Sequence, residues 1–451
     1  METTVTITAK QRAEDGRRVD GWQRAFAIAI CVVAAFMVAA PVVFPPGVDN
    51  AHYTYLAQNL VQGRLSVDNI PAYYPDLVTW QGHTYLPLGP LPGVLLIPFL
   101  PLLMLGVQLV WVGYLFTLLN VWLFYRVLGQ AGVTGERRQW ALLLFFGSTS
   151  YLAIAVIGSS YFFAHITTLT FILAAVTEAL GKRRPLLIGL FIGLAGMVRL
   201  TAIFSLPFFL WLLWRTKDQP AEDAEGERSS DESSIQALGD QSKPKVEALR
   251  VRHFAVGVTA LLLGLVGPIV LLGLYNYLRF GSFLESGYSL ATLGYPPLRD
   301  ARSYGLFSLA HIPKNLVMML FQGPLPYPRQ DAPILLFPYM VPSPWGMGLL
   351  YTSPALLYAF RNRLKDTLTQ ACLLGALCGM VPIITYYGVG WIQFGFRYAL
   401  DFLPFVLILA ARGFPNPMSR LSRILVLAGT AVCIWGSTFL LIWIHEIKLG
   451  P

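Results

Sequence analysis

Long runs of apolar residues dominate the chain, and short polar segments separate them. A helix needs roughly 20 mostly apolar residues to cross the hydrocarbon core of a bilayer. By that measure the pattern predicts an all-α fold, a polytopic membrane helix bundle with about 11 transmembrane helices. The expected spans are 25–45, 108–127, 140–158, 161–181, 185–198, 200–214, 254–275, 345–360, 367–387, 392–411 and 424–444.

One further apolar segment, Pro87–Leu105, is long enough to cross but holds five prolines. Cytoplasmic loops carry an excess of lysine and arginine, so the basic clusters decide whether this segment crosses. If it only lies in the membrane surface, the N-terminus is cytoplasmic, the C-terminus is outside, and all but nine of the 33 basic residues are cytoplasmic. We adopt that topology, because the alternative moves these clusters outside: Arg126/Arg137/Arg138, Lys182/Arg183/Arg184, Arg215/Lys217, Arg361/Arg363/Lys365 and Arg412/Arg420/Arg423.

The hydrophilic stretches divide the chain into four parts. Residues 46–107 and 276–344 form the two long outer loops, and Ala51–Gln62 within the first loop predicts a short helix on the membrane surface. The segment 216–252 is rich in charged residues and serine, which is typical of a disordered linker. The expected parts are a cytoplasmic N-terminus at 1–24, helices 1–6 at 25–215, the cytoplasmic linker at 216–252 and helices 7–11 at 253–451.

Composition narrows the class of protein. Charged residues make up only 13% of the 451 residues, whereas soluble domains hold about 25%, which excludes an ordinary soluble enzyme and a disordered chain. The four cysteines lie in apolar runs and show neither a metal-binding spacing nor a disulfide framework. The net charge of +9 lies mainly on the predicted cytoplasmic side, where it sets orientation and indicates no nucleic-acid partner.

Acidic residues are scarce, so any carboxylate chemistry on the outer face has few candidates. Asp49 directly follows the first span and precedes the surface helix, where it is either a helix N-cap or a general base. For Asp68 and Asp76, the sequence favours structural roles. The alternative is that one of them is a second active-site acid. The outward acids are Asp49, Asp68, Asp76, Glu285, Asp300, Asp331, Asp401 and Glu446.

Two arginines lie in apolar sequence near the predicted outer face, Arg199 in GMVRLTAIF and Arg397 in WIQFGFRYALDFLP. A charge embedded in a membrane segment is costly and is therefore a functional candidate. The bidentate guanidinium fork suits phosphate. The structural alternatives are snorkelling to lipid headgroups and, for Arg397, an ion pair with Asp401 four residues later.

Histidines and tyrosines supply candidate substrate contacts. His52 and His83 share the first outer loop with Asp49, and the spacing is too unspecific to assign a metal site, so metal binding stays open. His165 lies near the outer end of its span, where a hydrogen-bonded core histidine is the commoner role. Tyr53 and other tyrosines of this loop suit stacking on a sugar as well as an aromatic belt at the membrane surface.

Several motifs together resemble a known family. They are DNAHYTYLAQNLVQGRLSVD, YLPLGPLPGVLLIPF, GLAGMVRLTAIFSLPFF, LYNYLRFGSFLESGY, SPWGMGLLYTSPALL and WIQFGFRYALDFLPF, in that order over most of residues 20–412. The chain resembles the GT-C superfamily of membrane glycosyltransferases. The most similar branch is that of the polyprenyl-phosphate-sugar-dependent enzymes related to protein mannosyltransferases and aminoarabinose transferases.

The resemblance implies an inverting transfer of a sugar from an outer-leaflet polyprenyl phosphate to a glycan, lipid or protein acceptor hydroxyl. Asp49 would be the general base, and Arg199 and Arg397 would hold the donor phosphate. The sequence requires no cofactor, although a divalent cation is compatible with it. Many relatives carry two adjacent acids where this chain has Asp49–Asn50, so a second acid would come from Asp68 or Asp76.

Two other functions remain open at this level. A lipid-glycan flippase or transporter would need polar residues buried at the membrane midplane, and the predicted spans contain few. A lipid-linked glycan polymerase or ligase typically relies on arginines in a late outer loop. The second outer loop supplies Arg279, Arg299, Arg302 and Arg329.

Overall fold

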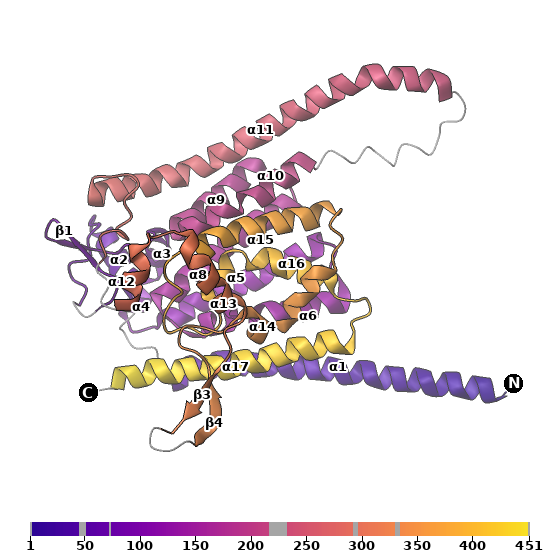
Figure 1. Ribbon diagram of the computed structural model, residues 1–451, viewed down its shortest axis with the longest axis horizontal. Helices are drawn as coiled ribbons and strands as arrows, with labels where there is room; N and C mark the ends of the chain where they lie inside the picture. The colour runs from indigo at the N-terminus through magenta and orange to yellow at the C-terminus, as the bar shows by residue number, and fades with distance from the viewer. Residues whose placement is uncertain are drawn as a thin grey trace.

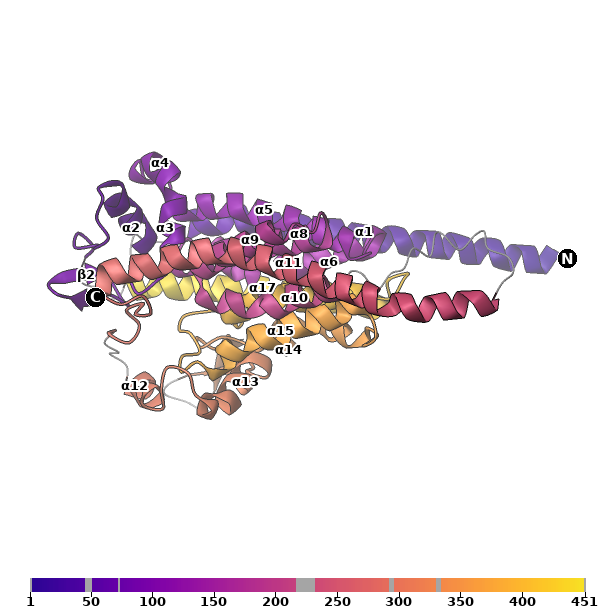
Figure 2. The ribbon, with the colours of Figure 1, turned by 90° about the horizontal axis from the view of Figure 1, so that it is seen from above.

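The computed structural model describes residues 2–44, 51–71, 74–215, 232–291, 296–329 and 334–449. The fold is mostly helical, with its longest helices running roughly along one axis: α1 and α17 on one side of the bundle and α11 on the other (Figure 1). We call the end of the bundle that carries α2, β1, α12 and the C-terminus the loop end, and the opposite end, where the N-terminus lies, the N-terminal end (Figures 1 and 2).

In the first half of the chain, the helices and strands run as follows: α1 (Glu2–Val43), α2 (His52–Val61), β1 (Val78–Trp80), β2 (His83–Tyr85), α3 (Leu91–Leu96), η2 (Ile97–Phe99), α4 (Leu100–Met104), α5 (Leu109–Gln130), α6 (Gly135–Gly147), α7 (Tyr151–Val156), α8 (Ser160–Leu180), α9 (Pro185–Val198), η3 (Leu200–Ser205) and α10 (Leu206–Arg215). A short helix expected at Ala51–Gln62 is confirmed as α2. Segment Pro87–Leu105 folds as three short helices instead of one long helix. Its prolines carry no backbone N–H and therefore interrupt the series of helical hydrogen bonds.

The second half of the chain holds α11 (Glu232–Phe280), α12 (Pro296–Ser303), η5 (Leu309–His311), α13 (Ile312–Leu320), β3 (Leu325–Pro328), β4 (Leu335–Val341), α14 (Leu349–Thr352), η6 (Pro354–Arg361), α15 (Thr367–Thr385), η7 (Arg397–Asp401), α16 (Leu403–Gly413) and α17 (Arg420–Leu449). Two antiparallel hairpins, β1–β2 and β3–β4, modify the all-α prediction. The expected linker is helical from Glu232 onward, where it is continuous with the apolar part of α11. Residues 216–231 lie outside the described residues.

The prediction of about 11 transmembrane helices is wrong. Among the described residues, six helices are long and apolar enough to cross a membrane, which indicates a multi-pass membrane protein. They are Gly21–Val43, Leu109–Gln130, Ser160–Leu180, Val251–Phe280, Thr367–Thr385 and Arg420–His445.

The other five expected spans are apolar but form shorter or interrupted helices. Residues 140–158 are divided between α6 and α7, and 345–360 between α14 and the 3₁₀ helix η6. Residues 185–198 form the 14-residue α9, about 21 Å long, which is less than the ~30 Å hydrocarbon core. The segments 200–214 and 392–411 likewise form a 3₁₀ turn followed by a short α-helix. Hydropathy reports the apolar run and not the continuity of the helix within it.

Glycines bring α9 and α11 into close backbone contact. Gly189 and Gly264 face the partner helix's backbone at positions where a Cβ would collide with a carbonyl oxygen. Such small-residue contacts are the usual way in which membrane helices pack closely. Gly89 of the first loop likewise leaves no room for a Cβ against the carbonyls of Met197 and Val198. The first loop is therefore held against the loop end of α9, one residue before Arg199.

Ion pairs tie helices together near the N-terminal end of the bundle. Arg423 on α17 reaches Glu136 on α6 at 2.7 Å, and Arg412 on α16 reaches Asp366 at 2.5 Å. Asp366 is also the N-cap of α15, because its Oδ2 accepts the Thr369 N–H at 2.8 Å. Partial burial opposes ionisation, but Arg412 and Thr369 lower the pKa of Asp366 to about 2.

We expect Asp366→Ala to lower the free energy of unfolding by about 0.5–2 kcal/mol near neutral pH, the usual cost of losing an N-cap. The folded-state pKa lies below the unfolded value of about 3.9, so the contribution is complete above that pH and disappears as the pH falls toward 2. Thermal unfolding in detergent across this range measures both effects. Asp366→Asn is the matched control, since it keeps a capping oxygen and loses only the charge; an equal loss in both variants would contradict the capping role.

Candidate functional site

Arg199 lies where the helix through α9 is interrupted, with its backbone extended (φ −141°, ψ 111°) before η3 begins. Its guanidinium forms an ion pair with Asp401: Nε lies 3.1 Å from Oδ1, and Nη2 lies 3.2 Å from Oδ2. The Thr201 hydroxyl donates to the same carboxylate at 2.5 Å. Asp401 is only 1% exposed and Arg199 about 20%. A predicted phosphate ligand is therefore already paired with a buried carboxylate.

Arg397 is not the partner of Asp401, which excludes that ion pair as its structural role. The two residues begin and end η7, a 3₁₀ helix with about three residues per turn, so positions four apart point in different directions. The backbone N–H of Arg397 donates to Gln393 Oε1 at 3.3 Å. Its guanidinium carbon lies 5.5 Å from the Phe162 ring and 5.3 Å from the Tyr398 ring. Within the described part of the chain, the buried Nε of Arg397 has no hydrogen-bond partner.

Tyr398 is the point where three sequence-predicted residues meet. Its ring lies 5.2 Å from the guanidinium carbon of Arg199, 5.3 Å from that of Arg397, and 5.8 Å from the ring of His165. A cation within about 6 Å of an aromatic face is attracted by the ring quadrupole. His165 is buried, and its Nδ1 has no partner among the described residues. We call Arg199, Arg397, Tyr398 and His165 the arginine cluster.

Tyr288, from the second long loop, extends the arginine cluster toward the loop end. Burial raises the pKa of Tyr288 above its usual value, the nearby Tyr398 adds to that rise, and Arg199 opposes it. Even so, 39% of Tyr288 is exposed. His165 is thus enclosed by protein, whereas Tyr288 and Arg199 keep accessible surface.

Asp76 of the first loop approaches this region through Tyr161. The Tyr161 hydroxyl donates to Asp76 Oδ2 at 2.8 Å. The same hydroxyl lies 3.5 Å from Nε2 of His52, and that nitrogen lies 3.0 Å from the carbonyl oxygen of Pro75. Asp76 also acts electrostatically on Tyr288, so of the two candidate second acids it is the one beside the arginine cluster.

Asp68, in the segment before β1, lies against His83 at the start of strand β2. The Asp68 carboxylate accepts the Thr84 N–H at 2.7 Å and the Ser66 hydroxyl at 2.7 Å, and it lies 3.0 Å from His83 Nδ1. Slight burial opposes ionisation, but these hydrogen bonds hold the pKa of Asp68 below its usual value. These contacts join the segment before β1 to strand β2, and none of them reaches the arginine cluster, so they describe a structural role.

Tyr53 anchors the surface helix α2 to the bundle. Its backbone N–H donates to the Ser160 hydroxyl at 3.0 Å, and its side chain is fully buried. Burial raises the pKa of Tyr53, and Arg199 is among the charges that oppose the rise. Tyr53 therefore lies within electrostatic reach of the arginine cluster, although its buried ring is not free to stack on a ligand.

Asp49, the expected general base, lies outside the described residues. No three His, Cys, Asp or Glu side chains gather in the ranges that the structure describes, so these ranges offer no ligand set for the divalent cation considered above. The sequence did not single out Tyr288, Tyr398 or Tyr161. A tyrosine next to Arg397 was visible, but only the fold reveals that both arginines share its ring.

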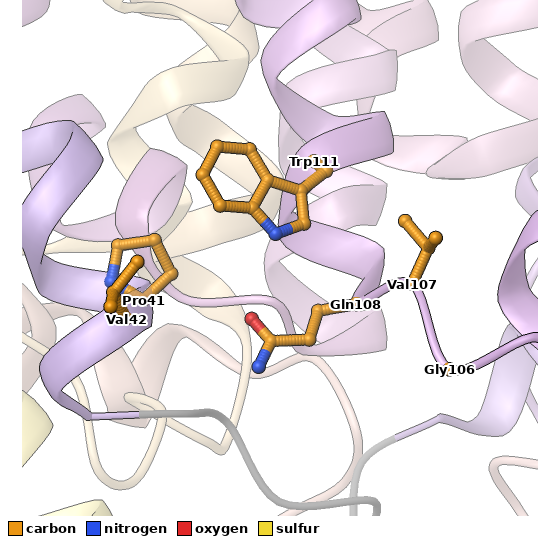
Figure 3. Close-up of a pocket in the computed structure, with 6 residues that line it drawn as sticks. All are labelled: Pro41, Val42, Gly106, Val107, Gln108 and Trp111. Atoms are coloured by element: carbon orange, nitrogen blue, oxygen red, sulfur yellow. The ribbon is translucent and has the colours of Figure 1, made fainter.

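A separate cavity of about 450 Å³ lies between the end of α1 and the start of α5, with Trp111 and Gln108 beside Pro41 and Val42 (Figure 3). Gly106 and Val107 complete its lining. None of the lining residues is charged, so the cavity offers no counter-charge for a phosphate and is distinct from the arginine cluster.

Comparisons of the chain with models of known protein families, with curated proteins and with solved structures match nothing.

Proposed function

We propose that the chain is an integral membrane glycosyltransferase that transfers a sugar from a polyprenyl phosphate donor to an acceptor hydroxyl. The observation that carries the proposal is the arginine cluster. The guanidinium of Arg397, whose Nε has no hydrogen-bond partner among the described residues, lies near the ring of Tyr398, which Arg199 also approaches. A buried donor without a partner is costly, and a phosphate oxygen would satisfy it. Arg199, already neutralised by Asp401, would act mainly by positioning Tyr398.

In the proposed reaction, Asp49 accepts the proton of the acceptor hydroxyl while its oxygen forms a bond to the anomeric carbon. The bond from that carbon to the phosphate oxygen breaks, and the configuration inverts. The polyprenyl phosphate leaves with an additional negative charge, which Arg397 stabilises. Asp49 precedes His52 by three residues in the sequence. His52 in turn lies beside Tyr161 and Asp76.

The proposed location is the cell membrane, with the N-terminus in the cytoplasm and the active site on the other side. The N-terminus lies at the opposite end of the bundle from the first loop and the C-terminus (Figures 1 and 2). Arg138 and Arg423, from two of the basic clusters, belong to α6 and α17 near the N-terminal end. The positive-inside rule therefore favours this orientation.

A glycan polymerase or ligase is less well supported, because two of its candidate arginines serve the fold. Arg279 is buried and donates to the Leu86 carbonyl, at 2.5 Å, and to Asn276. Arg302 donates to the carbonyls of three residues, namely Tyr288, Ser289 and Ala291. Both guanidiniums therefore hold loop backbone, whereas Arg397 has donor capacity left.

We expect Asp49→Asn to reduce sugar transfer by ~10²–10⁴-fold, the usual contribution of a general base. Purified protein would be incubated with a panel of short-chain polyprenyl-phosphate sugars and a membrane extract as acceptor. Release of free polyprenyl phosphate reports turnover whatever the sugar. Asp300→Asn, another loop carboxylate that is exposed on α12, is the matched control and should retain full activity.

Different outcomes separate the alternatives. Full activity of Asp49→Asn would reject Asp49 as the base while leaving the reaction class intact. Turnover only with polyprenyl-diphosphate donors would instead indicate a polymerase or ligase. Lipid flipping in liposomes without sugar transfer would reject the glycosyltransferase altogether.

A further inference from the structure

The hairpin β3–β4 projects sideways from the bundle instead of extending it. Figure 1 shows the two strands reaching past α17, within the length of that helix. They pair antiparallel, from Leu325 with Val341 to Pro328 with Leu335. The Arg329 N–H also donates to the Ile334 carbonyl at 2.8 Å. The hairpin is thus an ordered element that leaves the helix bundle on the side that α17 presents to its surroundings.

Apolar side chains cover both faces of the hairpin. Successive strand residues point to opposite faces, yet Leu335, Leu336 and Phe337 are all exposed, Phe337 by 83%. Neither strand contains a charged residue. An apolar surface of this kind is unfavourable in water and marks contact with another molecule or a membrane. The exposed apolar set is Leu325, Tyr327, Leu335, Leu336, Phe337, Tyr339 and Met340.

Three prolines reduce the number of hydrogen-bond donors on the strand edges. Pro326 and Pro328 lie in β3, and Pro338 lies in β4. A strand edge in contact with lipid is costly because its N–H groups lack partners, and proline carries no N–H. Edge prolines also oppose pairing with a strand from another chain. Both effects favour lipid over a second copy of the chain as the neighbour of the hairpin.

The base of the hairpin is fixed to the bundle by backbone contacts. The Gly348 N–H donates to the Gln322 carbonyl at 2.8 Å, just before β3. After β4, Gln393 donates its backbone N–H to the Pro344 carbonyl at 3.2 Å and its Nε2 to the Trp345 carbonyl at 2.8 Å. Gln393 is also the residue whose Oε1 accepts the Arg397 N–H. The hairpin is therefore a fixed projection whose base adjoins the arginine cluster.

We propose that the β3–β4 hairpin docks on the membrane lipid of the loop-end leaflet, at the boundary between headgroups and acyl chains. At that level, apolar side chains reach the acyl chains, while headgroups and water form hydrogen bonds with the remaining N–H and C=O groups at the strand edges. Tyr327 and Tyr339 suit this boundary, where tyrosine is enriched. The apolar surface of the hairpin then continues the lipid-facing side of the bundle. The assignment is independent of any enzymatic activity.

Spin labels would test the docking. Phe337→Cys carries the label in protein reconstituted into phosphatidylcholine–phosphatidylglycerol nanodiscs. Cys31→Ala and Cys378→Ala remove the accessible thiols, while buried Cys372 and Cys433 remain. Collisions with oxygen, which partitions into lipid, are compared with collisions with a water-soluble nickel chelate. Tyr339→Cys gives a second, independent position on the hairpin.

Two reference sites calibrate the measurement. Leu263→Cys, 67% exposed within the α11 span, represents lipid, and Lys365→Cys, exposed before α15, represents water. We expect the oxygen-to-nickel ratio at Phe337 to exceed that at Lys365 several-fold and to fall below that at Leu263. A ratio equal to that at Lys365 would overturn the proposal. Protection from both reagents, with spectral broadening when two copies share a disc, would overturn it in favour of self-association.

Discussion

Arg397→Gln is expected to abolish the stabilisation of the protein by farnesyl phosphate and to lower sugar transfer by ~10²–10³-fold, the usual cost of removing a preorganised donor at a developing charge. The reason is that the buried Nε of Arg397 has no hydrogen-bond partner in the part of the chain that the structure describes, while the carboxylate of Asp401 already neutralises Arg199. Thermal unfolding in detergent with farnesyl phosphate or with farnesol separates phosphate binding from binding of the apolar chain. A ligand present at 100 times its dissociation constant adds about 2.7 kcal/mol of stability.

Arg361→Gln is the matched control for this substitution. Arg361 also lies near a tyrosine ring, with its guanidinium carbon 5.7 Å from Tyr358, but it belongs to η6 and lies near Gly413, at the opposite end of α16 from η7 and Arg397. The control should respond to farnesyl phosphate like the unmodified protein. Equal stabilisation of Arg397→Gln and the control by farnesyl phosphate would reject Arg397 as a phosphate ligand. A response of all variants to farnesol alone would show that the site recognises only the chain.

Hydropathy located the continuous helices well, because it reports the free energy of transferring side chains from water to an apolar phase, and a membrane span places its side chains in lipid. The expected spans 108–127 and 367–387 correspond closely to α5 and α15. It did not detect where α6 gives way to α7, or where α9 ends at an extended Arg199. Those interruptions depend on partners supplied by distant segments, and no local window contains them.

The same limit applies to the candidate site. Arginine in apolar sequence is costly, so Arg199 and Arg397 were identifiable from the sequence alone. The partner of Arg199 lies 202 residues away, whereas helical spacing offered that carboxylate only to Arg397, as one structural alternative. That alternative does not hold because η7 is a 3₁₀ helix, a local geometry that the residue pattern does not reveal. The position of Tyr288 beside the arginine cluster was equally unpredictable, because a loop residue has no periodicity from which to infer its neighbours.

Asp401→Ala is expected to lower the free energy of unfolding by about 3–5 kcal/mol, the cost of leaving a buried charge without its partner. The carboxylate is 1% exposed, and its loss removes the acceptor for Arg199 and for the Thr201 hydroxyl. Thermal or denaturant-induced unfolding in detergent measures the effect. The double variant Arg199→Met with Asp401→Leu removes both charges and should recover most of the loss, since a buried ion pair can be replaced by apolar residues of similar volume.

The double variant also distinguishes the two arginines. If Arg199 serves the fold by pairing with Asp401, the folded double variant still gains stability from farnesyl phosphate, because Arg397 remains in place. If Arg199 itself binds the phosphate, the double variant is stable but no longer responds to the ligand, and the assignment of the phosphate to Arg397 fails. A double variant no more stable than Asp401→Ala would instead show that Thr201 and the surrounding packing, not the unpaired charge, account for the loss. Each result attributes a separate role to one of the residues around Tyr398.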